Sequence, residues 1–240
     1  MKILSTLTIC SGLAFASVSF GQIGSQFPEW QSVKILQTVE PIFPFMLAQQ
    51  GITRGEARVA VNTDPQGKLV EWLVVGYTRP EFANEAVGVI RQWGFVPARL
   101  RGEPVGTTIE VIFYFEAKGV VVSTTTIDVL ERETMFAIGR YAYQPCSLRD
   151  LDRIPTPLAT VAPAYPVELI RKGVRGKVTV DFYIDETGIV RMPSVSPNDN
   201  SELTALSIEA LRKWKFEPPA RNGKPVLVKA SQVFDFNSKN

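Results

Sequence analysis

Histidine is absent from this chain of 240 residues, and cysteine occurs only twice, as Cys10 and Cys146. Without histidine the chain cannot form a Ser-His-Asp or Cys-His nucleophile system, or a zinc site that needs imidazole. Asp181 and Asp185 come closest to a pair of catalytic carboxylates, but the solvent side of a strand and a turn account for them. We therefore expect no enzymatic activity, no catalytic residue, no metal site and no cofactor.

The chain also lacks a surplus of charge of either sign. Lysine and arginine together number 26, against 24 aspartate and glutamate residues, which leaves a net charge of +2. Without a basic surplus we expect no nucleic-acid partner. The hydrophobic fraction of 45% is high enough for packed cores, so global disorder is not expected.

Only the N-terminus carries a long apolar run. Lys2 precedes an apolar stretch over residues 3–20, and the small residues Ser19 and Gly21 stand before a cleavage point at Gln22, which is the pattern of a secretory signal peptide. We predict a signal peptide over residues 1–21 and an exported protein in which Cys146 has no partner for an intrachain disulfide. The alternative is a retained membrane anchor, for which the run is of marginal length and rich in serine and threonine.

The rest of the chain contains the same series of landmarks twice. Three pairs of residues are each separated by 121 positions: Gly67 and Gly188, Trp93 and Trp214, and Phe115 and Phe236. Landmarks that recur in the same order and at the same spacing indicate a duplicated domain. The predicted organisation is an N-terminal lead-in at 22–38, a first copy at 39–116, a linker at 117–154 and a second copy at 155–240.

Each copy is predicted to be a small α+β module, in the order helix, strand, strand, helix, strand, with a three-stranded antiparallel sheet. In the second copy, apolar periodicity predicts helices over 166–172 and 201–214 and strands over 178–184, 189–196 and 226–236. In the first copy, Thr78 and Glu81 have the spacing of a capping box at the start of the longer helix. Residues 120–122 and 124–126 of the linker are expected to prolong the strand before them.

Eleven residues of the second copy occur in an order and with gaps that are typical of one family: Tyr165, Pro166, Gly173, Gly176, Asp185, Gly188, Trp214, Phe216, Pro218, Gly223 and Pro225. On these residues the region of about 155–237 resembles the C-terminal domain of the TonB proteins. The first copy is similar but diverged, with Phe43 in place of Tyr165 and Glu103 in place of Lys224.

The resemblance implies a domain of the periplasm of Gram-negative bacteria. Domains of the family bind a short extended segment, the TonB box, of outer-membrane receptors, and pass on force from an inner-membrane motor. A three-stranded sheet has a free edge, and an extended peptide can pair with such an edge through backbone hydrogen bonds. In the family this edge is the last strand, so the implied peptide-binding residues are Val226, Leu227, Val228, Lys229, Ala230, Ser231, Gln232 and Val233.

Gln232 interrupts the apolar pattern of the last strand where the first copy has Val111. It indicates either a bulge or local hydrogen bonding near an edge, or a polar contact to a bound strand.

Three functional interpretations follow from the sequence. The first is an exported tandem module that binds peptide segments of outer-membrane receptors or other envelope proteins without transducing energy. The second is an energy transducer that keeps its N-terminal helix in the inner membrane and works with the motor complex there. The third is a structural protein of the envelope that self-associates, for example as a homodimer, through its free sheet edges.

Overall fold

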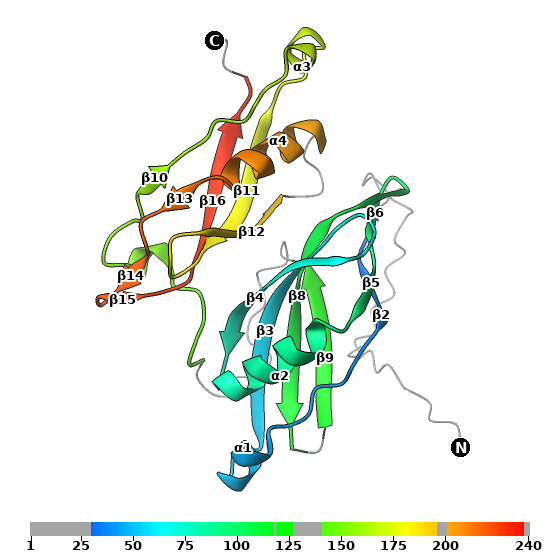
Figure 1. Ribbon diagram of the computed structural model, residues 1–240, viewed down its shortest axis with the longest axis vertical. Helices are drawn as coiled ribbons and strands as arrows, with labels where there is room; N and C mark the ends of the chain where they lie inside the picture. The colour runs from blue at the N-terminus through cyan, green and yellow to red at the C-terminus, as the bar shows by residue number, and fades with distance from the viewer. Residues whose placement is uncertain (1–29, 118, 127–140, 196–200, 238–240) are drawn as a thin grey trace, which may run out of the picture.

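The computed structural model describes residues 30–117, 119–126, 141–195 and 201–237. The predicted signal peptide, residues 1–21, lies outside them, as do residues 22–29 of the predicted lead-in and residues 118 and 127–140 of the predicted linker. Within the described residues, no helix has the length and apolar character needed to cross a membrane. The described chain forms two modules of the predicted kind, one from each copy of the repeat (Figure 1).

The first module is a twisted antiparallel sheet with one long helix on one face. Its strands lie in the order β4-β3-β8-β9, and α2 packs across them (Figure 1). The bounds are α1 Phe45–Gln49, β3 Arg54–Thr63, β4 Leu69–Tyr77, α2 Pro80–Ile90, β8 Thr107–Glu116 and β9 Gly119–Thr126. Short strands border this core: β1 Trp30–Gln31, β2 Lys34–Gln37, β5 Gly94–Val96, β6 Ala98–Leu100 and β7 Glu103–Val105.

The second module repeats this plan with a three-stranded sheet in the order β12-β11-β16. The bounds are α3 Val167–Arg171, β11 Lys177–Ile184, β12 Val190–Val195, α4 Ser201–Leu211 and β16 Val228–Asp235. The short elements are the 3-10 helix η1 Leu148–Asp150 and the strands β10 Pro157–Ala159, β13 Lys215–Phe216, β14 Ala220–Arg221 and β15 Lys224–Pro225. The α+β class and the predicted order of the main elements are therefore confirmed.

Each module has its own core between its sheet and its long helix. Strand residues that alternate along β3 and β8 point toward α2, and the corresponding residues of β11 and β16 point toward α4. At the centre of the first core, a side-chain Cβ at Gly55 would lie 1.8 Å from the ring of Phe82, so only glycine leaves room for that ring. Gly176 and Leu203 stand at the equivalent places in the second module, where the smaller side chain leaves more space.

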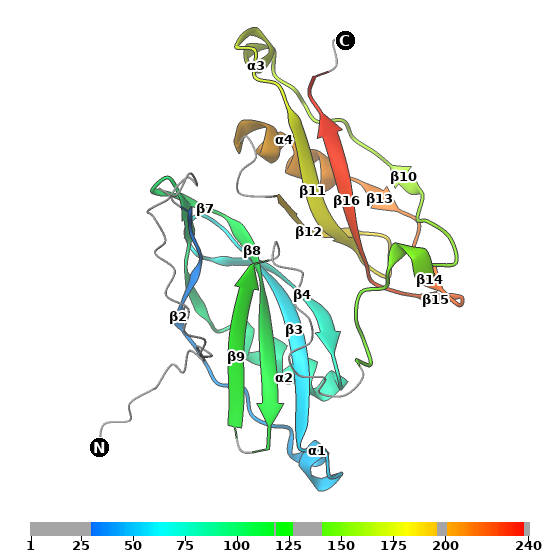
Figure 2. The ribbon, with the colours of Figure 1, turned by 180° about the vertical axis from the view of Figure 1, so that it is seen from behind.

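The first module differs from the prediction by having a fourth strand. Residues 120–122 and 124–126 do not prolong β8, because Glu116 pairs with Gly119 and the chain turns back as a hairpin. β9 is rich in valine and threonine, which favour strands, and it runs antiparallel to β8 through eight consecutive pairs (Figure 2). Part of the predicted linker therefore belongs to the first sheet.

The predicted capping box does not form. The helix α2 begins one residue later, with Arg79 as its N-cap, and the cap has no side-chain hydrogen bond. The hydroxyl of Thr78 instead accepts a hydrogen bond from the backbone N–H of Glu56 at 3.0 Å. Pro80 lies in the first turn of α2 and has no backbone N–H, so one donor fewer needs a partner at the start of the helix. The helix therefore begins without a capping box.

The two modules contact each other through residues that point away from their helices. Ala60, Leu73 and Val75 of the first module form one buried cluster with Tyr183, Met192 and Leu227 of the second. The segment between the modules adds to this contact. Tyr143 exchanges backbone hydrogen bonds with Tyr77 at 3.0 and 3.2 Å, and its hydroxyl donates to Glu186 at 2.6 Å. The second module is thus docked on the first (Figures 1 and 2).

Candidate functional site

One side of β16 borders no other strand over residues 231–235, within the part of the chain that the structure describes. We call this stretch the open edge. On its other side β16 pairs with β11 without any shift of register, from Lys177 opposite Asp235 to Ile184 opposite Val228. The open edge runs along the outside of the second module (Figure 2).

Two hydrogen bonds show which backbone groups face the open edge. Phe236 donates its N–H to the carbonyl of Gly176 at 2.8 Å, so the even-numbered residues of β16 bond toward β11. The carbonyl of Leu227 accepts from the N–H of Cys146 at 2.7 Å on the opposite side. The backbone groups of Ser231, Val233 and Asp235 therefore point outward and are available to an added strand.

The predicted site residues divide along this alternation. Val226 precedes the strand and donates its N–H to Pro219 at 2.9 Å, and Leu227 and Val228 are fully buried. Val228, Ala230 and Gln232 direct their backbone groups to β11. Of the eight predicted residues, Ser231 and Val233 direct their backbone groups to the open edge. Lys229 directly follows Val228, which forms an isolated parallel bridge with Cys146.

Asp235 belongs to the open edge although it was not predicted. The sequence predicts a strand that extends to Phe236, and alternate amides of such a strand face its free edge. The paired residues of the two strands are only visible in the structure, so the phase of the alternation could not be assigned from the sequence.

Gln232 pairs with Val180 in the regular register, so it makes no bulge. Its side-chain amide Nε2 donates to the carbonyl of Val233 at 2.8 Å. That carbonyl is one of the outward groups of the open edge. Gln232 therefore satisfies an edge acceptor locally, and an added strand would compete with this side chain for it.

The surface around the open edge is mixed in character. The side chain of Val233 is 50% exposed, while Ser231 donates its hydroxyl to Asp181 and Lys177 lies 3.3 Å from Asp235. The backbone N–H of Asn237 and the ammonium of Lys177 hold the pKa of Asp235 below its ordinary value, although partial desolvation opposes them. A bound strand would thus meet one apolar and several hydrogen-bonding side chains.

The residues of the family pattern hold the module together and do not lie on the open edge. Tyr165 donates its hydroxyl to the carbonyl of Val174, and its ring contacts that of Phe236 edge to face with centroids 5.1 Å apart. Pro166 is the N-cap of α3, and Gly173 and Gly176 have positive φ values of 68° and 155° after that helix. These contacts fix the lead into β11.

Asp185 and Gly188 form the turn between β11 and β12. One oxygen of Asp185 accepts from the backbone N–H of Thr187 at 2.9 Å, from that of Ile189 at 3.0 Å and from the hydroxyl of Thr187 at 2.6 Å. Burial raises the pKa of Asp185, but these bonds and the nearby Arg191 outweigh it and hold the pKa below its usual range. Gly188 has a φ of 84°, and a Cβ there would lie 2.1 Å from the carbonyl oxygen of Phe216.

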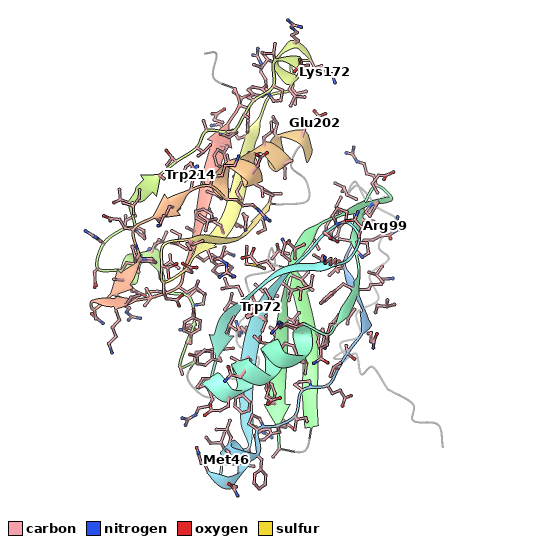
Figure 3. The ribbon with its side chains drawn as sticks, in the orientation of Figure 1. Met46, Trp72, Arg99, Lys172, Glu202 and Trp214 are labelled. Carbon is pink, nitrogen blue, oxygen red and sulfur yellow. The ribbon has the colours of Figure 1, made fainter. Side chains whose placement is uncertain are left out.

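The remaining pattern residues join the lead-in of the module to its C-terminal half. Trp214, which is labelled in Figure 3, donates its indole N–H to the carbonyl of Val161 at 2.9 Å, and its ring packs with Phe216 and Phe234. Pro218, Gly223 and Pro225 lie in the segment that forms the β14–β15 hairpin. Asp152 caps that hairpin by accepting the backbone N–H groups of Asn222 and Gly223 at 2.7 and 2.8 Å.

The same contacts recur in the first module. Trp93 donates its indole N–H to Val39 at 3.0 Å, as Trp214 does to Val161. A Cβ at Gly67 would lie 2.2 Å from the carbonyl oxygen of Phe95, as one at Gly188 would from Phe216. The repeat therefore extends to atomic contacts, including the tryptophan bond to the lead-in, which sequence reasoning missed because its acceptor is a backbone carbonyl.

A family model for the C-terminal region of the Gram-negative bacterial TonB protein matches residues 39–117 and again residues 161–238. The chain belongs to this family. The prediction of two copies of the domain is confirmed by the two matched ranges.

Two proteins similar to the chain carry the TonB name. The protein TonB of Vibrio cholerae serotype O1 is 30% identical to it over 69 residues, which cover 28% of each chain. The chain thus matches little more than a quarter of the length of that relative. The solution structure of the C-terminal domain of Pseudomonas aeruginosa TonB is 30% identical and covers 40% of this chain and 95% of its own, with a TM-score of 0.33.

The described residues include no group of three or more cysteine, aspartate and glutamate side chains that could hold a metal ion. Cys146 is buried and free, and it lies beside the start of β16. Asp181 accepts the hydroxyl of Ser231, and Asp185 is occupied by its turn. What the arrangement offers chemically is a row of backbone hydrogen-bonding groups on an exposed strand.

Proposed function

We propose that this protein binds extended peptide segments of outer-membrane receptors, or of other envelope proteins, by strand addition at the open edge of β16, and serves TonB-dependent transport from the periplasm. The observation that carries the proposal is the outward direction of the backbone groups of Ser231, Val233 and Asp235. Membership of the TonB C-terminal family supports it.

The length of the open edge limits the segment that it can hold. Three outward residues at alternate positions can pair with a strand of about five residues, since each outward residue offers one donor and one acceptor. At the N-terminal end Cys146 already bonds to Leu227, so an added strand would begin beyond Lys229. Backbone pairing supplies affinity in such complexes, and alternate side chains supply specificity.

The test uses variants of Val233, whose N–H faces outward and makes no bond to β11. Val233→Pro removes this donor, and proline is tolerated on an edge strand where the N–H faces solvent. Val233→Ala is the matched control, because it keeps the donor and loses most of the side chain. Overlapping synthetic peptides that cover the periplasmic segments of outer-membrane receptors serve as ligands, with fluorescence anisotropy as the readout.

We expect a subset of the peptides to bind the wild type and the Val233→Ala variant and to lose affinity at least about tenfold for the Val233→Pro variant, since the edge N–H is part of the pairing. Backbone amide signals of Ser231, Val233 and Asp235 should shift on binding in nuclear magnetic resonance spectra. Equal affinity for the proline variant, with its fold intact, would exclude this edge as the site.

The proposed location is tested separately by N-terminal sequencing of the protein from the fractionated envelope. A mature N-terminus at Gln22 in the soluble periplasmic fraction is the expected result. A protein that keeps residues 1–21 and sediments with the inner membrane would replace the proposal with an anchored transducer.

A further inference from the structure

The first module contains an edge equivalent to the open edge of β16. The spacing of the repeat places β8 where the second module has β16, with Phe115 in place of Phe236. Both strands pair with their neighbours in the same register, since Gly55 lies opposite Phe115 as Gly176 bonds to Phe236. Residues Glu110, Ile112 and Tyr114 of β8 therefore correspond to Ser231, Val233 and Asp235.

The direction of the backbone groups of β8 can also be assigned. Ala117 donates its N–H to the carbonyl of Thr53 at 2.9 Å, so odd-numbered residues on this strand bond toward β3. The even-numbered residues Glu110, Ile112 and Tyr114 direct their groups to the other side, as their counterparts do in β16.

That side of β8 is filled by β9. Glu110 lies opposite Thr125, Ile112 opposite Ser123 and Tyr114 opposite Val121, in a ladder without a shift of register. Each of the three outward positions thus has a partner from the same chain, and Figure 2 shows β9 along the outer edge of this sheet. The second module has no corresponding strand among the described residues, where Cys146 forms a single isolated bridge with Val228 at the start of β16.

The two modules also differ at the pair of equivalent positions 111 and 232, and the residue at each position suits the state of the nearby edge. In the first module this position is Val111, which is fully buried beneath a sheet that continues into β9. In the second module it is Gln232, whose amide bonds to the outward carbonyl of Val233. The module whose edge is filled therefore has an apolar residue, Val111, at this position. The module whose edge is open has Gln232, which donates a hydrogen bond to an exposed carbonyl of that edge.

We propose that β9 is a built-in occupant of the peptide-binding edge of the first module, so that the tandem presents one edge to partners and keeps the other closed with its own chain. The proposal rests on the proposed function only in treating this edge of the fold as the peptide-binding one. The class of ligand that β9 represents is an extended segment rich in β-branched residues.

The covalent connection gives β9 an advantage over any free peptide. Its hairpin joins it directly to β8, so its effective concentration at this edge is on the order of millimolar. A peptide of ordinary affinity would have to displace all eight pairs of the ladder. The first module is consequently closed to partners in the intact chain and contributes to the protein through its docking on the second module.

The first test needs no ligand and uses the full chain. Amide hydrogen exchange compares Glu110, Ile112 and Tyr114 with Ser231, Val233 and Asp235. We expect the three amides of β8 to exchange slower by an order of magnitude or more, because β9 protects them. Equal exchange at the two edges would overturn the proposal, whether or not peptides bind β16.

The second test opens the edge of β8. Ser123→Pro removes an N–H that faces β8, and Val122→Pro is the matched control, because its N–H faces away from β8 on the outer side of an edge strand. We expect fast exchange at Ile112 and Tyr114 in the Ser123→Pro variant and slow exchange in the control. Unchanged protection in Ser123→Pro would contradict the proposal.

The probe for binding is a synthetic peptide with the sequence of residues 119–126. Added to the Ser123→Pro variant, it should restore slow exchange at Ile112 and Tyr114, and in the wild type it should leave the amides of β8 unchanged. A peptide that shifts the β8 amides of the wild type would show that β9 does not close the edge. Failure to bind the variant, while the indole N–H signals of Trp93 and Trp214 retain their wild-type shifts, would show that this edge does not accept strands.

Discussion

Arg191 of β12 lies with its Nε 2.6 Å from Oε1 of Glu71 on β4, and this ion pair joins the two modules. The same guanidinium donates from Nη2 to the carbonyl of Trp72 at 3.2 Å, at the place where the modules meet in Figure 3. Both charged side chains are partly shielded from solvent and border the buried cluster around Met192. The pair therefore orients one module on the other while the apolar cluster supplies contact area.

The contribution of this ion pair can be isolated with a double-mutant cycle. Glu71→Gln and Arg191→Met should show a coupling of about 1 kcal/mol in the free energy of unfolding, as expected for a partly exposed pair. The coupling should decrease with added salt. Urea unfolding of the four proteins gives the value, and a cycle on the exposed pair Glu209 and Lys213 supplies a control that should not alter docking. Additive single effects would show that the pair does not orient the modules.

Leu227 should matter more than the ion pair. Its side chain is fully buried and lies in the cluster shared by the two modules, directly before β16. Leu227→Ala removes contacts on both modules and should lower the free energy of unfolding by about 3 kcal/mol. Leu158→Ala is the control, because Leu158 is 61% exposed and its truncation should change stability by less than about 0.5 kcal/mol. A similar small effect at Leu227 would mean that the inter-module cluster is not packed in solution.

Alanine substitutions at Gly67 and Gly102 distinguish the cost of a positive φ from the cost of a steric contact. Their φ values are 80° and 84°, so alanine is strained to a similar degree at both. Only at Gly67 would the new Cβ meet the carbonyl oxygen of Phe95, at 2.2 Å, while Gly102 has open space. We expect Gly102→Ala to cost about 1 kcal/mol and Gly67→Ala at least about 3 kcal/mol, because the latter must also move a strand. Thermal unfolding of both variants checks the difference, and equal losses would show that the contact relaxes freely.

The repeat made most of the fold predictable from sequence. Apolar alternation along the strands, and the turn glycines at 67 and 188, are set by local chemistry that recurs in both copies. The helix cap at Thr78 was predicted wrongly, because the spacing of Thr78 and Glu81 fits a capping box. In the structure the hydroxyl of Thr78 accepts a hydrogen bond from the backbone N–H of Glu56 on β3. A local motif cannot show that a distant group competes for the same atom.

The candidate site was less accessible to prediction than the fold. The sequence identified the last strand, yet which of its amides face outward depends on one bond, from Phe236 to Gly176. The role of β9 was missed because valine and threonine at 120–126 favour any strand, whether it continues β8 or folds back on it. Docking of the modules depends on long-range contacts such as that of Arg191 with Glu71, for which the sequence carries no local signal.

The last prediction concerns the dependence of stability on pH at Asp185. Hydrogen bonds from Thr187 and Ile189 and the charge of Arg191 outweigh the effect of burial, so the pKa of Asp185 in the folded protein lies below that of the unfolded chain, which is about 3.9. The ionised carboxylate therefore stabilises the fold at pH values above about 4, and this stabilisation is lost as the pH falls through the lower folded pKa.

Asp185→Asn should consequently destabilise the protein at pH 7 and flatten its stability profile on the acid side. The amide cannot accept the three bonds of the turn as well as a carboxylate does, and it no longer releases a proton on folding. Urea unfolding between pH 7 and pH 3 gives the two profiles, and Asp150→Asn, a change at an exposed carboxylate of η1, serves as the control. Parallel profiles for wild type and Asp185→Asn would show that this turn is not the source of the acid sensitivity.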